Sequence, residues 1–463
     1  MLKEQVTTKT SRTSLQGHWS SRITFILAVT GSAVGLGNIW KFPYVAGQNG
    51  GGAFVLVYLL CVVVIGMPVM MSEVLIGRRG RRNPITTMAL LGKEEGGSRH
   101  WWLIGLMGVL AGILILSYYS VIAGWILAYV FKSVAGVFVG ATATEVSTQF
   151  TSFTSDWRLV AMSHTFFMGL TIFIVARGIE RGLEQAVRFM VPVLLLLMLM
   201  LLGYSINSGY FVEGLTFMFK PDFGNFTWDS VLAAMGQAFF TLSIGMGCIM
   251  AYGAYLPQDT SITGATAAVV TADTLIAILS GLVIFPLVFA NGLEPSSGPG
   301  LVFNTLPLAF GQMTGGVVFA TFFFLLLSFA AWTSAISLME PAVAWGIEYL
   351  GRTRVQAATF MGVLIWIIGF TTVLSFNVLD DLTFYKGTLF DNIDHLTSNI
   401  MLPLGGLFIT VFAVWVMSRN STVQELETSS TLYKLWRLLA GFIAPFAILF
   451  IFLEAIGFLP DFG

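Results

Sequence analysis

Charged residues are scarce in this sequence. Only 10% of its 463 residues are Asp, Glu, Lys or Arg, whereas soluble domains carry about 25%. Hydrophobic residues make up 56% of the chain, and its mean hydropathy is +0.83. A soluble fold of this composition would have too little polar surface to face water. The composition therefore excludes an ordinary soluble domain and predicts a polytopic membrane protein.

Net charge, cysteine and histidine are also low, and each scarcity excludes a class of function. The 23 basic and 24 acidic residues leave no basic field for nucleic acid. The two cysteines lie in apolar runs and are expected to be free thiols. The four histidines are too far apart for metal-ligand spacing. Because the sequence also has no recognisable nucleophile–base set or phosphate-binding loop, we expect neither an enzyme nor an organic cofactor.

Long apolar runs are abundant. A bilayer-spanning helix needs about 20 apolar residues, and eleven runs reach this length. We therefore expect an all-α membrane protein of about 11 transmembrane helices, with a cytoplasmic N-terminal segment, 1–22, before a single transmembrane domain, 23–463. The runs lie at about 23–44, 52–75, 101–131, 159–177, 187–206, 229–255, 264–290, 316–350, 355–377, 396–417 and 432–458.

The distribution of Lys and Arg orients these spans. If the N-terminus is cytoplasmic, 18 of the 23 basic residues fall in cytoplasmic segments. Cytoplasmic loops are enriched in positive charge, so we expect a multi-pass protein of the cell (inner) membrane with a cytoplasmic N-terminus and an extracellular C-terminus. The basic residues left at the outer side are Lys41, Lys132, Arg158, Lys220 and Lys386.

The first and sixth runs each contain a glycine cluster. TGSAVGLGN spans 30–38 and TLSIGMGC spans 241–248. An opened backbone within a membrane is tolerated only where it faces protein or water. Glycine can also serve close helix packing, but matched interruptions in spans one and six indicate a midplane site between two inverted repeats. The repeats would cover about 23–206 and 229–417, with an extra helix at about 432–458.

Five motifs occur in an order and spacing that cover nearly the whole chain. They are GSAVGLGNIWKFPYVAGQNGGGAF (31–54), PVMMSEVLIGR (68–78), SYYS (117–120), GQAFFTLSIGMG (236–247) and AAWTSAIS (330–337). In these motifs the chain resembles the neurotransmitter:sodium symporter family, and within it the bacterial amino-acid branch. The resemblance implies a leucine-transporter-like fold of 5+5 inverted repeats with broken helices 1 and 6. It also implies Na⁺ binding at two sites.

The resemblance places one sodium ion at the first break. Its ligands would be the Ala33 carbonyl, Asn38, Thr241 and Asp273. Many relatives have Asn in place of Asp273, and a carboxylate deep in a span is a functional candidate by default; a protonated or helix-end acid is the alternative. Ala277 stands where chloride-binding animal relatives have Ser. We therefore expect transport without chloride, because Asp273 would supply the negative charge.

The second sodium ion would lie between spans one and eight. The resemblance implies carbonyl ligands from Gly31, Val34 and Ala330, and hydroxyl ligands from Thr333 and Ser334. Hydroxyl side chains in membrane helices often bond back to their own helix, which is the alternative role of the last two residues.

The same resemblance implies an amino acid as substrate. Amine-transporting relatives carry Asp where this chain has Gly35. The substrate carboxylate would bind the amides of Leu36 and Gly37, the Tyr119 hydroxyl and the first sodium ion. Met246 stands where a close bacterial relative has Phe, and a flexible Met suits varied ligands, so large aliphatic and aromatic L-amino acids are expected. The expected substrate-binding set, each member of which could alone be core packing, is Ala33, Gly35, Leu36, Gly37, Ile115, Tyr119, Phe240, Thr241, Ser243, Met246, Ser334, Ser337 and Leu338.

Gates are expected on both sides of this site. Outside, Lys41 would pair with Asp394, or with Asp391, above a lid of Phe240 and Tyr119. Inside, the family often has Arg three residues before the Trp19 position, where this chain has Gln16, so Arg22 or Arg12 would have to substitute. Glu73 is expected to brace the broken first helix. The expected inner-gate residues are Trp19, Tyr255, Glu340 and Glu348.

Together these features predict a sodium-coupled symporter that imports large hydrophobic L-amino acids by alternating access. Its partners would be a small hydrophobic amino acid, sodium ions and the lipid bilayer. The alternative is an amino-acid-binding sensor or a sodium-dependent channel on the same fold, which would bind the ligand without accumulating it.

Overall fold

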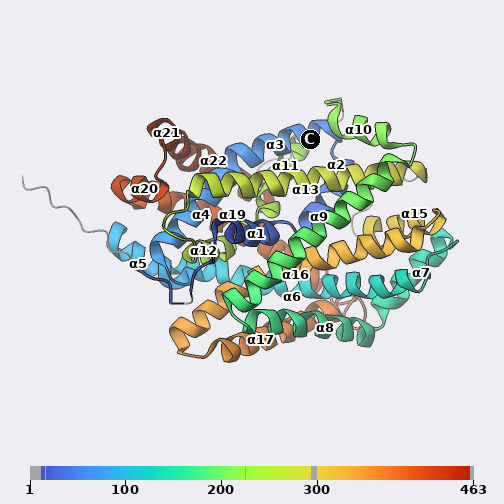
Figure 1. Ribbon diagram of the computed structural model, residues 1–463, viewed down its shortest axis with the longest axis horizontal. Coiled ribbons are helices and arrows are strands. Elements are labelled where there is room, and N and C mark those ends of the chain that lie inside the picture. The colour runs from blue at the N-terminus through green and yellow to red at the C-terminus, as the bar shows by residue number, and fades with distance from the viewer. Residues whose placement is uncertain (1–11, 16, 225, 293–299, 459–463) are drawn as a thin grey trace, which may run out of the picture.

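The computed structural model describes residues 12–15, 17–224, 226–292 and 300–458. Within these ranges the chain is a bundle of helices (Figure 1). Nine of the described helices are long and apolar enough to cross a membrane, and a tenth span is possible across one bent pair. The predicted all-α membrane fold is confirmed, whereas the count of 11 helices stays a prediction.

The helical elements follow the predicted apolar runs closely, and the η elements are short π-helical stretches. The first part of the chain contains α1 (Arg22–Ala33), η1 (Gly37–Lys41), α2 (Phe42–Gln48), α3 (Gly52–Cys61), η2 (Val62–Gly66), α4 (Met67–Gly80), α5 (Pro84–Gly96), α6 (Trp102–Val134), α7 (Ala143–Ser155), α8 (Trp157–Ala176), η3 (Ile179–Glu184), α9 (Gln185–Ile206) and α10 (Phe211–Phe219). The remainder contains α11 (Trp228–Thr241), α12 (Cys248–Ala254), α13 (Ile262–Ala290), η4 (Leu301–Thr305), α15 (Leu306–Gln312), α16 (Gly316–Leu350), α17 (Arg354–Leu374), α18 (Leu389–Asp394), η5 (His395–Met401), α19 (Leu402–Val411), η6 (Phe412–Val416), α20 (Arg419–Leu426), α21 (Ser430–Leu438), η7 (Leu439–Ile443) and α22 (Ala444–Ala455).

Both predicted helix interruptions are present. The first separates α1 from η1 and α2, and the two halves are bent by 53°. The second separates α11 from α12 over residues 242–247. There Ser243, Gly245 and Gly247 have φ angles of 53°, 85° and 75°, in the left-handed region where glycine is the residue with least strain. A Cβ at Gly245 would also lie 2.6 Å from the Leu402 carbonyl oxygen, so close packing adds to the requirement for glycine.

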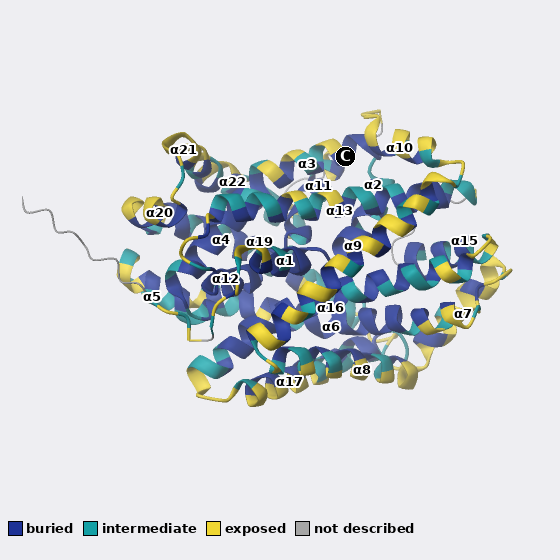
Figure 2. Cartoon of the chain, viewed as in Figure 1, coloured by how far each residue is buried: buried dark blue, intermediate teal, exposed yellow. Residues whose placement is uncertain are grey.

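Burial places the two breaks at the centre of the molecule. Figure 2 shows α1 and α12 as buried segments inside the bundle, whereas α8 and α17 expose residues along its edge. Large apolar side chains such as Phe166, Phe360 and Phe446 are 60%, 60% and 71% exposed. In a chain with spans of this length, such exposed apolar side chains face lipid.

The two ends of the bundle differ in their elements. One end carries α5 and α20, and the other carries α7, α10 and α15 (Figure 1). At the first end α20 is fastened by ion pairs, because Arg78 Nε lies 2.9 Å from Glu425 Oε2. Arg79 contacts Glu95 nearby at 3.0 Å.

Candidate functional site

The break after α1 is where three elements meet. The Ser32 carbonyl oxygen accepts hydrogen bonds from Ser243 Oγ and Ser334 Oγ, each at 3.1 Å. These hydroxyls come from the break before α12 and from the middle of α16. The two opened helices are therefore joined to each other and to α16 at one buried point.

Asn38, Thr241 and Asp273 form a buried polar cluster just beyond the first break. Asn38 Nδ2 donates to Asp273 Oδ1 at 2.7 Å and to Thr241 Oγ1 at 2.8 Å. The Thr241 hydroxyl donates to Asp273 Oδ2 at 3.0 Å, and the Gly35 amide donates to Asn38 Oδ1 at 3.1 Å. All three clustered side chains are fully buried. Hydroxyl and carboxylate oxygens are hard ligands of the kind that small cations prefer, whereas the Asn38 amide oxygen is directed at the Gly35 amide in this structure. The structure therefore brings together three of the residues predicted for the first sodium ion.

The residues predicted for a second sodium ion also lie together. A Cβ at Gly31 would be 3.2 Å from Thr333 Cβ, so α1 packs directly on α16 there. The Thr333 hydroxyl donates back to the Ala330 carbonyl of its own helix at 3.0 Å, whereas Ser334 donates across to α1. Val34 is buried at the end of α1. The back-bonding alternative thus describes Thr333 in this structure but not Ser334.

Gly35 occupies a space with no room for a side chain unless a neighbouring group moves. A Cβ at this position would lie 2.5 Å from Ser334 Oγ and 3.1 Å from the Tyr119 hydroxyl. The Leu36 amide donates to the same Tyr119 hydroxyl at 3.4 Å. A Cβ at Gly37 would lie 2.9 Å from the Phe240 ring. The opened backbone is therefore lined by the predicted tyrosine, serine and phenylalanine, and the Leu36 amide points at this tyrosine.

Small polar side chains continue the site toward α12. Ser32 Oγ donates to Ser337 Oγ, and Ser337 Oγ donates to the Ser334 carbonyl, both at 2.7 Å. Cys248 Sγ donates to the Ser243 carbonyl at 3.4 Å. Sequence reasoning missed Ser32 and Cys248 as neighbours of the site, although both lie inside the two glycine motifs that located it.

The remaining predicted pocket residues are buried on the elements that surround the breaks. Ala33, Ile115, Met246 and Leu338 are each less than 10% exposed. A Cβ at Gly112 of α6 would lie 3.2 Å from the Leu338 carbonyl and 3.6 Å from the Met246 carbonyl. This glycine lets α6 approach both α16 and the second break.

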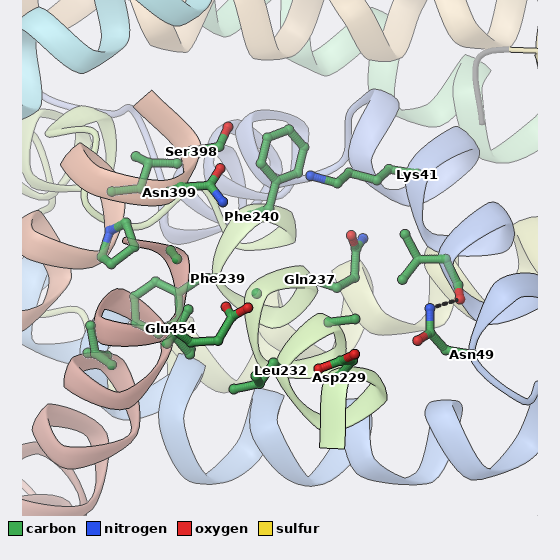
Figure 3. Close-up of a pocket in the computed structure, with 18 of the residues that line it drawn as sticks. Lys41, Asn49, Asp229, Leu232, Gln237, Phe239, Phe240, Ser398, Asn399 and Glu454 are labelled. Atoms are coloured by element: carbon green, nitrogen blue, oxygen red, sulfur yellow. Dashed lines mark hydrogen bonds between the residues drawn. The ribbon is translucent and has the colours of Figure 1, made fainter. Parts of the chain in front are cut away.

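Two cavities lie on the side of Phe240 that is predicted to face the outside of the cell. One, of about 230 Å³, is lined by Tyr119, Phe240, Lys41 and Asp394 among others. The other, of about 380 Å³, lies between α2, α11, η5, α19 and α22 and is shown in Figure 3. Lys41 and Phe240 border both cavities, so they stand between the central site and this space.

The predicted outer ion pair is not formed in this structure. Lys41 Nζ lies 4.1 Å from the centre of the Phe240 ring, in a cation–π contact. Within the described contacts Asp394 instead accepts a hydrogen bond from Ser398 Oγ at 2.9 Å. The other candidate, Asp391, is used as part of the capping box that starts α18. Lys41 and Asp394 nevertheless line the same cavity.

Glu73 braces a different helix from the one expected. Its Oε1 accepts a 2.5 Å hydrogen bond from the Gly245 amide, in the second break rather than the first. The first break is held instead by Gln237, whose side-chain amide donates to the Gly37 carbonyl at 2.9 Å. Sequence reasoning could not identify this partner, because α4 packs on α12 and the group that Glu73 contacts is a backbone amide.

At the opposite end of the site Trp19 closes the space beneath the breaks. Its indole NH donates to the Tyr252 carbonyl at 3.2 Å, and its ring contacts those of Tyr252 and Tyr255. The Tyr255 hydroxyl donates to Glu340 Oε1 at 2.9 Å. Glu340 is fully buried and forms a two-point ion pair with Arg354. Arg354 is a functional candidate that sequence reasoning missed.

Glu348, a predicted inner-gate residue, is hydrogen-bonded to Asn83. Its carboxylate accepts hydrogen bonds from the Asn83 amide at 2.9 Å and from Asn83 Nδ2 at 2.6 Å. Arg12 pairs with Glu94, and Arg22 Nη2 is close to Gly264, so neither is placed as the family's missing arginine. Gln16 itself lies outside the described residues.

Two interrupted helices that meet at buried oxygen clusters inside a membrane bundle define a transporter of small solutes and cations. The sequence profile of the sodium:neurotransmitter symporter family matches residues 16–149 and 148–460, and the chain belongs to this family. It is a sodium-dependent membrane transporter and not an enzyme.

Individual relatives agree with this assignment. The chain is 38% identical over 445 residues to the uncharacterized sodium-dependent transporter YhdH of Bacillus subtilis, covering 95% of this chain and 98% of the relative. It is 23% identical over 513 residues to the sodium-dependent nutrient amino acid transporter 1 of Drosophila mojavensis, covering 94% and 75%. The crystal structure of MhsT in complex with L-phenylalanine matches with a TM-score of 0.88 and 44% identity, covering 95% and 100%. The predicted leucine-transporter-like fold and the resemblance to the bacterial amino-acid branch are confirmed. The match to MhsT further identifies the bacterial multihydrophobic amino acid transporter as a protein that this chain resembles.

Proposed function

We propose that this protein imports large aliphatic and aromatic L-amino acids together with sodium, by alternating access and without chloride. The central support is the space at Gly35, between Ser334 and Tyr119. A Cβ would overlap Ser334 Oγ there. Because position 35 is glycine, it offers no carboxylate to pair with a substrate amine. An amino acid brings its own carboxylate, and the amides of Leu36 and Gly37 with the Tyr119 hydroxyl are donors suited to it.

The side chain of the substrate would lie against Ile115, Phe240, Met246 and Leu338. These apolar residues surround the breaks, and a methionine can change its rotamer to fit ligands of different shape. MhsT, whose fold this chain shares, is known in complex with L-phenylalanine, and the Drosophila relative is named for nutrient amino acids. Both names fit a broad preference for larger apolar amino acids.

Two sodium ions are the expected cations. The Ala33 carbonyl, Asn38, Thr241 and Asp273 would hold the first, and the second would bind Gly31, Val34, Ala330, Thr333 and Ser334. Asp273 replaces a bound anion in this proposal, because its carboxylate is buried among neutral groups and would balance the charge of the cation beside it. Chloride would then be unnecessary.

Alternating access would use the groups on either side of the breaks. We infer that the end with α5 and α20 is cytoplasmic, since most of the basic residues fall there. Closure of the outer gate would bring Lys41 and Asp394 together on the outer side of Phe240 and Tyr119. Inward opening would require Trp19 to leave Tyr252 and Tyr255, with the Glu340–Arg354 pair and Glu348 fixing the helices around it.

Competition for labelled leucine on the purified protein tests the substrate and anion claims. Tryptophan, phenylalanine, isoleucine and leucine should displace the label at far lower concentrations than glycine, alanine, glutamate or amines such as tyramine. Binding should require sodium and be the same in chloride and in gluconate. Preference for glycine or for an amine would contradict the pocket assignment. A steep chloride requirement would contradict only the proposed role of Asp273, and it would leave the pocket assignment unaffected. Sodium-dependent binding that never leads to uptake would favour the sensor or channel.

A further inference from the structure

An open groove lies on the surface of the helix bundle, between the end of α16 and the start of α17. Its volume is about 590 Å³, within the usual range of ligand sites. The floor is formed where two small residues let the helices meet, because a Cβ at Gly346 would lie 3.2 Å from Ala357 Cβ. Met361 completes this floor. None of its lining residues belongs to the broken helices or to either candidate sodium site.

The walls of the groove are apolar and exposed. Leu350, Val355, Phe360 and Val363 are 43%, 60%, 60% and 42% exposed. The start of α17 and Val363 are nine residues apart, which is about 14 Å along a helix. This is about half of a hydrocarbon core of roughly 30 Å. The groove therefore runs through the depth of one leaflet, on a face that Figure 2 shows with exposed residues along α17.

Polar and cationic groups gather at the mouth of the groove. Arg352 is exposed and forms no ion pair within the described part of the chain, whereas Arg354, two residues later, forms an ion pair with Glu340. The side-chain Oε1 of Gln356 accepts from the Thr353 backbone amide at 3.2 Å, which leaves the Gln356 NH₂ group for another acceptor. No Asp or Glu is present among the described lining residues.

Aromatic residues mark the same level as a membrane boundary. Trp345 and Tyr349, on the last turns of α16, stack with ring centres 5.3 Å apart. Trp and Tyr are enriched where a membrane meets water. The mouth of the groove therefore lies at headgroup depth and its interior at the depth of acyl chains.

We propose that this groove is a binding site for one anionic phospholipid of the surrounding leaflet. An acyl chain lies along Val355, Phe360 and Val363, and the phosphate binds Arg352 with a hydrogen bond from the Gln356 NH₂ group. A zwitterionic lipid presents the same chain and phosphate, but its own cation cancels the charge that Arg352 attracts. A basic residue at the membrane surface favours an anionic headgroup by about fivefold.

The test counts and locates bound lipid on the full-length transporter. The protein is reconstituted in nanodiscs of equal parts phosphatidylglycerol and phosphatidylcholine, in which either lipid carries a photoactivatable group near the end of one acyl chain. After illumination, peptide mapping gives the attachment site. Native mass spectrometry of protein released from the same bilayers gives the ratio of the two retained lipids. The variants are R352Q, the groove-filling V363W, and R99Q as a control that removes an exposed arginine away from the groove.

We expect phosphatidylglycerol to label residues 346–363 several-fold more than phosphatidylcholine in the wild type and in R99Q. R352Q should reduce the preference about fivefold while keeping some labelling, and V363W should reduce labelling by both lipids. Equal labelling by the two lipids, an unchanged preference in R352Q, or labelling spread evenly around the bundle would each overturn the proposal. Each variant must elute as a single species and be stabilised by sodium, which separates loss of the lipid site from misfolding.

Discussion

The substitution Gly35→Ala tests the central geometry of the substrate site. A methyl group at this position would lie 2.5 Å from Ser334 Oγ and 3.1 Å from the Tyr119 hydroxyl, so one of these groups must move. Displacing Ser334 breaks its hydrogen bond to the Ser32 carbonyl, which costs about 1 kcal/mol. Crowding a packed interior costs a further 1–3 kcal/mol, roughly.

The expected loss is therefore roughly 2–4 kcal/mol, or about 30- to 1000-fold in an equilibrium constant. Because the methyl group fills the space between the groups proposed to surround the substrate, we expect most of this loss in the apparent affinity for leucine. Uptake of labelled leucine into proteoliposomes, measured over a range of concentrations, gives that affinity.

Gly169→Ala is the matched control for Gly35→Ala. Gly169 lies within α8, and a Cβ there would have no neighbour within 4 Å. This variant should transport normally, and its stability should rise slightly because alanine favours helix. If Gly35→Ala binds leucine with wild-type affinity, the assignment of the substrate site to this break is wrong. Stabilisation of Gly35→Ala by sodium would show that a loss of leucine binding is not simple misfolding.

Three further predictions concern charged groups. Asp273→Asn should raise the sodium concentration for half-maximal leucine uptake by tenfold or more, on the order of 1.4 kcal/mol; an unchanged sodium dependence would contradict the proposed role of the Asp273 charge. Arg354→Gln leaves Glu340 buried without its partner, a loss that typically costs about 3–5 kcal/mol, so thermal unfolding should occur at markedly lower temperature. The double variant Glu340→Gln with Arg354→Gln should recover much of that stability, and a double variant as unstable as the single one would refute the reasoning. Burial raises the pKa of Glu95, but hydrogen bonds from Ser421 and Ser418 together with the Arg79 charge outweigh burial and lower the pKa overall. Its contribution is thus present above pH 4.5 and lost as the pH falls through the lowered pKa. Hydrogen exchange of α20 should rise there in the wild type, and the same rise on acidification in Glu95→Gln would contradict the assignment.

The membrane-spanning helices could be predicted because their signals are local. The run predicted at 316–350 became α16 with the same bounds, since a long apolar stretch lies between Gly315 and Gly351. Both glycines adopt positive φ angles, 77° and 62°, which end a helix at little cost. The break within the run at 229–255 was harder to predict, because α12 contains only seven residues and the glycines before it could equally serve close helix packing.

Contacts between distant segments could not be predicted in the same way. Glu340 and Arg354 are joined only because the turn between α16 and α17 folds one over the other. Composition gave no reason to choose this arginine over others near the same end of the bundle. Glu73 was placed correctly as a brace but on the wrong helix, since its partner is a backbone amide at Gly245, and backbone groups carry no sequence signal.

The predicted outer gate illustrates a different limit. Lys41 and Asp394 line one cavity, but Lys41 lies over Phe240 in this structure. Whether two gate residues touch depends on the conformational state of the transporter, and a single sequence encodes every state of the cycle. The sequence therefore predicted where the gate residues lie but not whether they are paired.

Accumulation of labelled leucine in proteoliposomes tests most directly whether sodium drives transport. With no membrane potential and a tenfold inward sodium gradient, one coupled ion supports up to about tenfold accumulation and two ions up to about 100-fold. We expect accumulation well above tenfold with sodium, the same in chloride and gluconate, and none when potassium replaces sodium. Equilibration of leucine without accumulation, or binding without uptake, would contradict the account.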